Sequence, residues 1–370
     1  MASELTGILT LLLSATLPEK GKALDHTLRQ TLFLEPRSRV RHILTLGFLV
    51  SLAMTAPTQA QKLSLLYNFK GSPNAANPRA GLVRDLSGNF YGTTAFGGKS
   101  DVFGTVFKLD KSNNETVLHS FKGNDGAFPL AALVMDVNGN LYGTTSSGGA
   151  SSEGVVFKLS KNGTESTLHN FTGQGDGANP DSSLLRDKKG NLYGTTQAGG
   201  AFGGGVVFEL TTAGNLIVLH SFCSQQACAD GQGPVAGLVK DSAGNLYGTT
   251  QYGGSPACSG QYTGCGVVFK VTPAKKETVL YTFCSAKNCT DGTNPIGGVI
   301  RDSAGNFYGT TSFGGDPNAS CGTVFELSPS PHRNRAIHLR RWNRRVRLPG
   351  KPAPRFEAQP LRHYGAWRLV

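Results

Sequence analysis

Asp136-Val-Asn-Gly-Asn-Leu-Tyr-Gly-Thr-Thr145 is the stretch that decides the fold, because close copies of it occur four more times. Its Tyr-Gly-Thr-Thr part begins at Tyr91, Tyr142, Tyr193, Tyr247 and Tyr308. The intervals between these tyrosines are 51, 51, 54 and 61 residues. A period of about fifty residues indicates a solenoid, a propeller or another repeat array.

Each repeat contains four short runs that favour β-strands. In the second repeat they lie at 133–134, 141–145, 154–159 and 166–171. These runs are rich in β-branched and aromatic residues and are bounded by Gly, Asn, Asp or Ser. Gly makes up 49 of 370 residues and no window keeps a helical apolar period, which argues against long helices. Four strands per repeat is typical of a propeller blade, so we predict an all-β propeller.

The ends of the repeat array suggest how the propeller closes. The first four repeats each end on a strand-like run such as 116–121 or 277–283, whereas the fifth stops after 322–327. Residues 63–69 copy this last run but have no repeat before them. We predict that 63–69 pairs with the last blade, which gives five four-stranded blades and leaves no open edge. A longer ring that is cut short is the alternative.

The aspartate that opens each motif is expected to shape a turn. Asp-x-x-Gly-Asn begins at Asp85, Asp136, Asp187, Asp241 and Asp302. The carboxylate can accept hydrogen bonds from the N–H groups just ahead of it, and Gly takes the φ > 0 position of a tight hairpin. An EF-hand would need more carboxylates and a closing Glu. We therefore expect neither a metal site nor a cofactor.

The net charge of +12 comes from the two ends of the chain. Residues 331–370 hold ten Arg and one Lys against one acid, and residues 1–60 hold six basic and four acidic residues. The remaining residues, 61–330, hold 19 basic and 19 acidic side chains. Because the repeats (61–329) are neutral, we expect no nucleic-acid binding.

The Arg-rich tail, 330–370, breaks the repeat in mid-unit and contains both tryptophans of the chain. We interpret it as disordered and without function, and as an extension translated out of frame. The run 340–347 could instead be an arm that binds RNA or a membrane surface, which is the alternative interpretation.

The N-terminal region indicates export. A basic segment, 37–41, precedes an apolar stretch, 42–54, and then Ala56-Pro-Thr-Gln-Ala60. This order describes a signal peptide over 37–60, cleaved after Ala60, and the apolar stretch is too short for a comfortable membrane span. Residues 1–36 are interpreted as a leader that is disordered or not part of the native protein. We expect a secreted or cell-surface bacterial protein with no transmembrane span in its mature chain.

The cysteines agree with export. Cys223/Cys228 and Cys284/Cys289 belong to two copies of Phe-Cys-x4-Cys-x-Asp-Gly, and Cys258/Cys265 bracket another insertion. We predict local disulfides that staple these longer loops in an oxidising compartment. A zinc site is the alternative, although it usually shows tighter Cys-x2-Cys spacing. Cys321 is left over, so other pairings stay open.

The repeated string resembles the tandem-repeat family known as GloVer-containing, choice-of-anchor proteins. The resemblance covers about 78–329, and it includes a Gly-Leu-Val-Arg core at 81–84. It implies a bacterial, secreted or surface-displayed, propeller-like protein without an assigned biochemical activity. The tail shows neither the apolar anchor nor a sorting motif, so the mode of attachment stays open.

Catalysis is not favoured by the sequence. His119, His169 and His220 share one position in the last run of their repeats, where Tyr67 and Tyr281 stand in other copies. We therefore expect packed or edge side chains rather than bases. The chain has no Gly-x-Ser-x-Gly and no His-Glu-x-x-His motif. We predict that it is not an enzyme and that it has no catalytic residues.

Binding is the function that the repeats favour. Rings that carry a hydroxyl suit stacking and hydrogen bonding to sugars, and repeated weak sites gain avidity. The candidate ligand-binding residues are Tyr91, Tyr142, Tyr193, Tyr247, Tyr308, Thr94, Thr145, Thr196, Thr250 and Thr311. The alternative is that these residues only stabilise the blades. We predict a monomeric binding or structural module, with glycans (a lectin-like role) or envelope proteins as partners.

Overall fold

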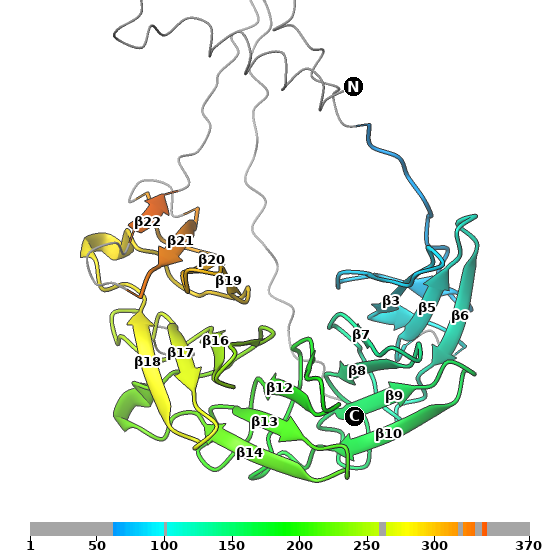
Figure 1. Ribbon diagram of the computed structural model, residues 1–370, viewed down its shortest axis with the longest axis horizontal. Helices are drawn as coiled ribbons and strands as arrows, with labels where there is room; N and C mark the ends of the chain where they lie inside the picture. The colour runs from blue at the N-terminus through cyan, green and yellow to red at the C-terminus, as the bar shows by residue number, and fades with distance from the viewer. Residues whose placement is uncertain (1–61, 100–101, 259–263, 317–320, 330–334, 339–370) are drawn as a thin grey trace, which may run out of the picture. The chain divides into compact units, whose positions relative to one another are not determined.

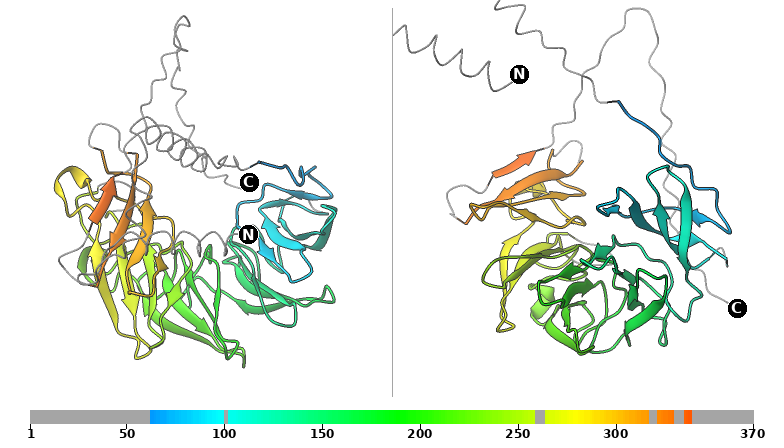
Figure 2. Two further views of the ribbon diagram at one scale, coloured as in Figure 1. Left: turned by 45° about the horizontal axis from the view of Figure 1, so that its top comes forward. Right: turned by 45° about the vertical axis from the view of Figure 1, so that its right-hand side comes forward.

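Each repeat forms one antiparallel sheet of its own. The structure is a computed structural model and describes residues 62–99, 102–258, 264–316, 321–329 and 335–338. These residues form five four-stranded sheets and one two-stranded sheet, joined by loops (Figures 1 and 2). The all-β, propeller-type prediction is confirmed. The predicted leader and signal peptide, 1–60, lie outside the described residues.

The strands of the five sheets follow chain order, with the shortest strand first. Sheet 1 consists of β2 (Val83–Arg84), β3 (Phe90–Thr94), β5 (Thr105–Leu109) and β6 (Glu115–Ser120). Sheet 2 consists of β7 (Val134–Met135), β8 (Leu141–Thr145), β9 (Val155–Leu159) and β10 (Glu165–Asn170). Sheet 3 consists of β11 (Leu185–Arg186), β12 (Leu192–Thr196), β13 (Val206–Leu210) and β14 (Leu216–Ser221).

The last two sheets repeat this plan. Sheet 4 consists of β15 (Val239–Lys240), β16 (Leu246–Thr250), β17 (Val267–Val271) and β18 (Glu277–Thr282). Sheet 5 consists of β19 (Ile300–Arg301), β20 (Phe307–Thr311), β21 (Thr323–Leu327) and β22 (Arg335–His338). β1 (Ala75–Ala76) pairs with β4 (Phe96–Gly97), and helical structure among the described residues is limited to the turns η2 (Gln226–Cys228) and η3 (Lys287–Cys289).

The glycine of Tyr-Gly-Thr-Thr is required by the core of each sheet. Gly143 in β8 stands opposite Phe157 in β9, and a Cβ on Gly143 would lie 2.6 Å from Phe157 Cζ. The ring of Phe157 is fully buried over this glycine. The same close approach recurs between glycine and phenylalanine in the other four sheets. The tetrapeptide therefore combines strand residues with one position where only hydrogen fits.

Consecutive sheets are joined by aromatic contacts and by hydrogen bonds. Phe121, just after β6, packs edge-on against Phe157 of the next sheet with ring centroids 5.2 Å apart. Three equivalent pairs join sheets 2 to 5 at 5.0–5.3 Å. The first threonine of the tetrapeptide adds a bond, since Thr93 Oγ1 donates to the carbonyl of Ala131 in the next repeat at 2.9 Å. Buried contacts of this kind make neighbouring sheets stabilise one another.

The hairpin before each tetrapeptide strand has the expected turn chemistry. Asp136 accepts hydrogen bonds at 2.9 Å from the backbone N–H groups of Asn138 and Asn140 and from the Asn140 side chain. Gly139 has φ +82°, the left-handed conformation that glycine adopts without strain. The aspartate therefore acts as the internal acceptor of the turn, as the sequence indicated.

The edge of sheet 5 differs from the expectation. Residues 63–69 form no strand, and β22 pairs with β21 instead. β22 lies inside the Arg-rich segment in which no ordered structure was expected. The segment was overlooked because it is no copy of the last strand, whereas a ladder uses backbone groups and tolerates many side chains. Phe69 nevertheless packs against Phe107 of sheet 1, with ring centroids 5.0 Å apart. The phenylalanine that follows the last strand of sheets 1 to 4 packs against the next sheet in the same way.

The predicted disulfide pairs are confirmed. Cys223–Cys228 and Cys284–Cys289 close the loops that contain η2 and η3, and Cys258–Cys265 closes the loop before β17. These three bonds do not include Cys321. In the described part of the chain, no helix is long and apolar enough to cross a membrane.

Candidate functional site

The repeated tyrosines use their hydroxyls within the fold. Each hydroxyl donates to the aspartate six residues earlier, at 2.9–3.2 Å. Tyr142, Tyr193 and Tyr247 are buried, with 6–9 % of their surface exposed, whereas Tyr91 and Tyr308 are partly exposed. Burial and then Asp136 raise the pKa of Tyr142. Burial would raise the pKa of Asp136, but bonds from Asn140 and Tyr142 outweigh it and lower that pKa.

The candidate threonines are deeper in the sheets than the tyrosines. Thr94, Thr145, Thr196 and Thr250 are fully buried, and Thr311 is 6 % exposed. Each hydroxyl donates to the carbonyl two residues ahead at 2.8–3.0 Å. These hydroxyls are therefore engaged in the loop that follows the strand, and the structure brings them to no open surface.

The tyrosine rings do line hollows between neighbouring sheets. Tyr91 lines a cavity of about 490 Å³ between sheets 1 and 2. Tyr142 lines one of about 270 Å³ between sheets 2 and 3, and Tyr247 lines one of about 380 Å³ between sheets 4 and 5. We call these hollows pocket 1/2, pocket 2/3 and pocket 4/5. The volumes of pockets 1/2 and 4/5 fall in the lower range of small-molecule sites, and that of pocket 2/3 is slightly below this range.

Basic side chains gather at these tyrosines from two directions. The residue paired with the tyrosine on the neighbouring strand is Lys158 in sheet 2 and Lys270 in sheet 4. Arg186 approaches from the first strand of the next sheet, so that its guanidinium lies 5.6 Å from the Tyr142 ring centroid, and Lys158 lies 5.9 Å from it. Arg301 takes the place of Arg186 in pocket 4/5. These cation–π contacts hold positive charge at the pocket walls.

Sequence reasoning missed these cations because they come from different repeats. Arg186 ends a run like Gly81-Leu-Val-Arg84. The sequence shows that this position is basic, but it does not show which side chain the basic residue contacts. Only the packing of one sheet on the next places it over the tyrosine of the preceding repeat. The alternation of strand residues could have put Lys158 beside Tyr142, since the two are cross-strand partners.

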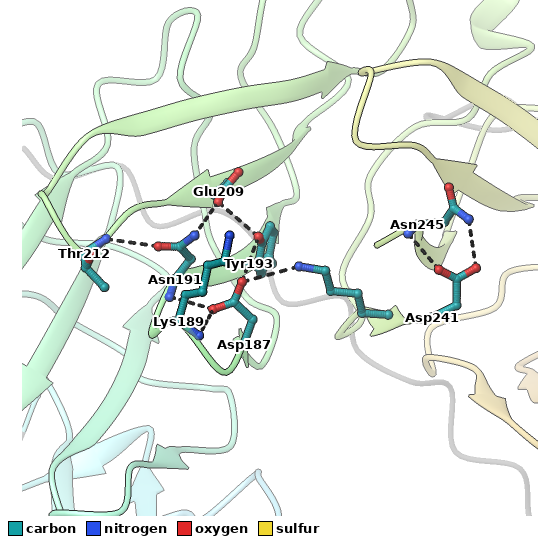
Figure 3. Close-up of polar contacts among 9 residues, drawn as sticks. Asp187, Lys189, Asn191, Tyr193, Glu209, Thr212, Asp241 and Asn245 are labelled. Atoms are coloured by element: carbon teal, nitrogen blue, oxygen red, sulfur yellow. Dashed lines mark hydrogen bonds and ion pairs between the residues drawn. The ribbon is translucent and has the colours of Figure 1, made fainter. Parts of the chain in front are cut away.

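The junction between sheets 3 and 4 is built differently (Figure 3). Here Glu209 replaces the lysine opposite the tyrosine and accepts from Tyr193 at 3.0 Å and from Asn191 at 2.8 Å. Lys240 lies 3.9 Å above the Tyr193 ring and 3.5 Å from Asp187. Hydrogen bonds to Tyr193 and the charge of Asp187 outweigh burial and raise the Lys240 pKa. The cation at this junction is therefore neutralised internally.

A histidine–aspartate pair ties the last strand of three sheets to the following loop. The pairs are His119–Asp125, His169–Asp176 and His220–Asp230, at 3.1–3.2 Å, with Tyr281–Asp291 at 2.8 Å in sheet 4. Burial lowers the pKa of His119, and Asp125 offsets this only in part. Since a tyrosine makes the same hydrogen bond in sheet 4, the interaction is explained by its structural role, which is to hold the loop against the last strand.

Two groups of side chains in the described part of the chain have the composition of a metal site. His119, Asp125 and Glu165 place their ligand atoms within 4.8 Å of one another. The place of Glu165 is taken by Leu216 in sheet 3 but by Glu277 in sheet 4, where the charges of His220 and Asp230 act on its pKa. A His–Asp–Glu arrangement therefore recurs at one further junction, with the composition of a strand-to-loop contact. Cys258, Cys265 and Cys284 are equally close, but their sulfurs are held in disulfides. Zinc needs thiolates, so the zinc alternative does not fit this oxidised state.

Asp181 breaks the symmetry of the repeats and was also missed. The residue at its position is Arg79 in the first repeat and Leu130, Val235 or Ile296 in the others. Burial raises the pKa of Asp181 to about 6. Its Oδ1 is enclosed and has no hydrogen-bond partner among the described residues. The signal that could have found it is that Asp181 is the one acidic residue at a position that is apolar in three of the other four repeats.

Comparisons with known proteins identify the repeat but not a reaction. A family model described as the Gloeobacter/Verrucomicrobia repeat matches residues 47–263, more than half of the chain. The solved structure of a gluconolactonase from Xanthomonas campestris is similar at 14 % identity and a TM-score of 0.40, covering 71 % of this chain and 78 % of that one. A luciferin-regenerating enzyme is similar at 13 % identity and a TM-score of 0.42, covering 71 % and 77 %. These values carry no conclusion about activity. No curated protein matches the sequence.

Proposed function

We propose that this chain, which belongs to the Gloeobacter/Verrucomicrobia repeat family, is an exported, non-enzymatic module that binds glycans in the pockets between its sheets. The observation that carries the proposal is the recurrence of one kind of pocket, lined by a repeat tyrosine, at three sheet junctions. A ring face with polar groups beside it suits a sugar, and a polymer that reaches several pockets gains avidity.

Export is supported by the cysteines. Three disulfides close short loops, and such bonds persist in oxidising compartments. The proposal places the mature protein outside the cytoplasm as a monomer, after removal of the signal peptide 37–60. Fractionation of cells that express the full chain tests this, because the protein should accumulate outside the cytoplasm with its N-terminus at Gln61. A full-length protein confined to the cytoplasm would refute export.

A lack of catalysis is supported by the use of the titratable groups. The repeated histidines bond to aspartates of their own loops, and the repeated aspartates bond to their own hairpins. A hydrolase is the competing function, and the observation that favours it is Asp181, whose raised pKa suits a general acid. A panel of lactones and glycosides tests it, and turnover that disappears in Asp181→Asn would make the protein an enzyme.

The binding test uses the full chain, produced with its disulfides formed, on an array of glycans and cell-wall polysaccharides. We expect saturable binding that is weakened by Tyr142→Ala or Tyr247→Ala in a folded variant. Thr145→Val is the matched control, because Thr145 is fully buried and lines none of the three described pockets. If the folded protein binds no glycan but retains an envelope protein in a pull-down, a protein scaffold replaces the glycan proposal.

A further inference from the structure

The inter-sheet pockets differ in their charge. In pocket 1/2 the lining residues Arg84 and Lys161 are balanced by Asp85 and Asp136. Two positive and two negative side chains leave this pocket neutral, as the repeats are overall. Pocket 1/2 therefore offers no net attraction for a charged ligand.

Pockets 2/3 and 4/5 are positively charged. Among the described residues, pocket 2/3 is lined by Lys158 and Arg186 and by no acidic side chain, and pocket 4/5 is lined by Lys270 and Arg301 and by no acidic side chain. None of these four cations forms an ion pair within the described part of the chain. Two like charges at one wall repel each other, so an anion bound between them would be favourable.

The guanidinium of Arg186, which lines pocket 2/3, has one nitrogen without a hydrogen-bond partner among the described residues. Arg186 Nε is buried and forms no hydrogen bond among the described residues. A buried donor without an acceptor is unfavourable, and a charged one more so. A carboxylate can accept two parallel hydrogen bonds from a guanidinium, which gives both strength and orientation. The Tyr142 ring beside it offers a flat apolar surface for the rest of the ligand.

The junction between sheets 3 and 4 provides an internal comparison. There the basic residue, Lys240, already has a carboxylate, that of Asp187, at 3.5 Å. In sheet 3, Glu209 occupies the position opposite the tyrosine that is lysine in sheets 2 and 4. Asp136 and Asp241 stand beside Tyr142 and Tyr247 as Asp187 does beside Tyr193, but among the described residues neither forms an ion pair with Arg186 or Arg301. The junction between sheets 3 and 4 therefore differs by its Lys240–Asp187 ion pair and by the second carboxylate of Glu209.

We propose that pockets 2/3 and 4/5 bind the carboxylates of an acidic polysaccharide, with Arg186 and Arg301 as the residues that select charge. The inference rests on the proposed glycan-binding function and names the class of glycan. Two like sites on one chain would bind two uronate residues of the same polymer, so that each site raises the effective concentration at the other.

The experiment compares one polymer in two charge states. Binding of the full chain to polygalacturonate and to its fully methyl-esterified form is measured by isothermal titration calorimetry. We expect binding to the acid only, weaker by about tenfold in Arg186→Gln because one charge-assisted hydrogen bond is lost. Lys188→Gln is the matched control, since Lys188 is exposed on the same hairpin and lines neither pocket. It should change the affinity by less than about twofold.

Three outcomes would overturn the inference. Equal binding of acid and ester, or equal weakening by Lys188→Gln and Arg186→Gln, would refute charge selection but leave glycan binding intact. Binding of neither polymer would also refute it, and the glycan array would then decide the proposed function separately. If Arg186→Gln does not fold, Glu209→Lys decides, because it gives sheet 3 the residue found in sheets 2 and 4. Tighter binding of polygalacturonate supports the inference, and unchanged or weaker binding refutes it.

Discussion

Replacing Asp181 by asparagine should stabilise the protein in a strongly pH-dependent way. Burial raises the pKa of Asp181 from its ordinary value of 3.8 to about 6. A tenfold change in proton affinity corresponds to about 1.36 kcal/mol, so the folded state is penalised by about 3 kcal/mol once the carboxyl is ionised. Asparagine has nearly the same shape as the protonated acid and carries no charge.

The direction of the pH effect follows from which state holds the proton. Below pH 3.8 the carboxyl is protonated in both states, and the penalty is absent. Between pH 3.8 and about 6 the unfolded chain loses the proton while the folded protein keeps it, so the free energy of unfolding falls as the pH rises. Above about pH 6 the penalty is complete.

Urea denaturation of the wild type and Asp181→Asn at pH 4, 6 and 8 measures this difference. We expect little change at pH 4 and a gain approaching 3 kcal/mol, order of magnitude, at pH 8. Asp136→Asn is the comparison with opposite sign, because hydrogen bonds lower the pKa of Asp136. Its loss of stability should be present at pH 8 and disappear as the pH falls through the folded-state pKa. A gain from Asp181→Asn that is equal at pH 4 and pH 8, or a loss at pH 8, would refute the reasoning.

Three further changes test the structural interpretation. Gly143→Ala should lower the free energy of unfolding in urea by about 1–3 kcal/mol, because its Cβ would overlap the Phe157 ring, and full stability would contradict that packing. His169→Tyr should change the stability to thermal unfolding little, since Tyr281 makes the equivalent hydrogen bond in sheet 4. His169→Ala should lower the free energy of unfolding by about 1 kcal/mol. Equal losses of stability in the two variants would contradict the role of this hydrogen bond in joining the strand to the loop. Replacing both Cys223 and Cys228 by serine should lower the free energy of unfolding by about 2 kcal/mol, measured by thermal unfolding under non-reducing conditions. An unchanged unfolding midpoint would show that the disulfide does not stabilise the loop.

The local structure of a repeat could be predicted because neighbouring residues determine it. Asp136, Gly139 and Asn140 carry all the groups that make the hairpin, so the motif alone indicates the turn. The cysteine pairs lie within short loops, where little chain has to be ordered to bring the sulfurs together. The binding candidates were less well predicted, since the threonines are buried and the tyrosine hydroxyls are satisfied by aspartates.

The sequence by itself determined the period, the strands of the first four repeats and the turn chemistry, and it predicted the disulfide pairs, because each depends on residues within one repeat. The tertiary structure decided how repeats meet: β22 at the edge of sheet 5, and Arg186 over the tyrosine of the preceding sheet. It also decided which cations are neutralised, as Lys240 is by Asp187. The contacts of Arg186 and Lys240 join side chains of neighbouring repeats, and a repeat pattern does not specify which of its faces will touch. The pairing of β22 with β21 uses backbone groups, which the side-chain pattern of the repeat does not reveal.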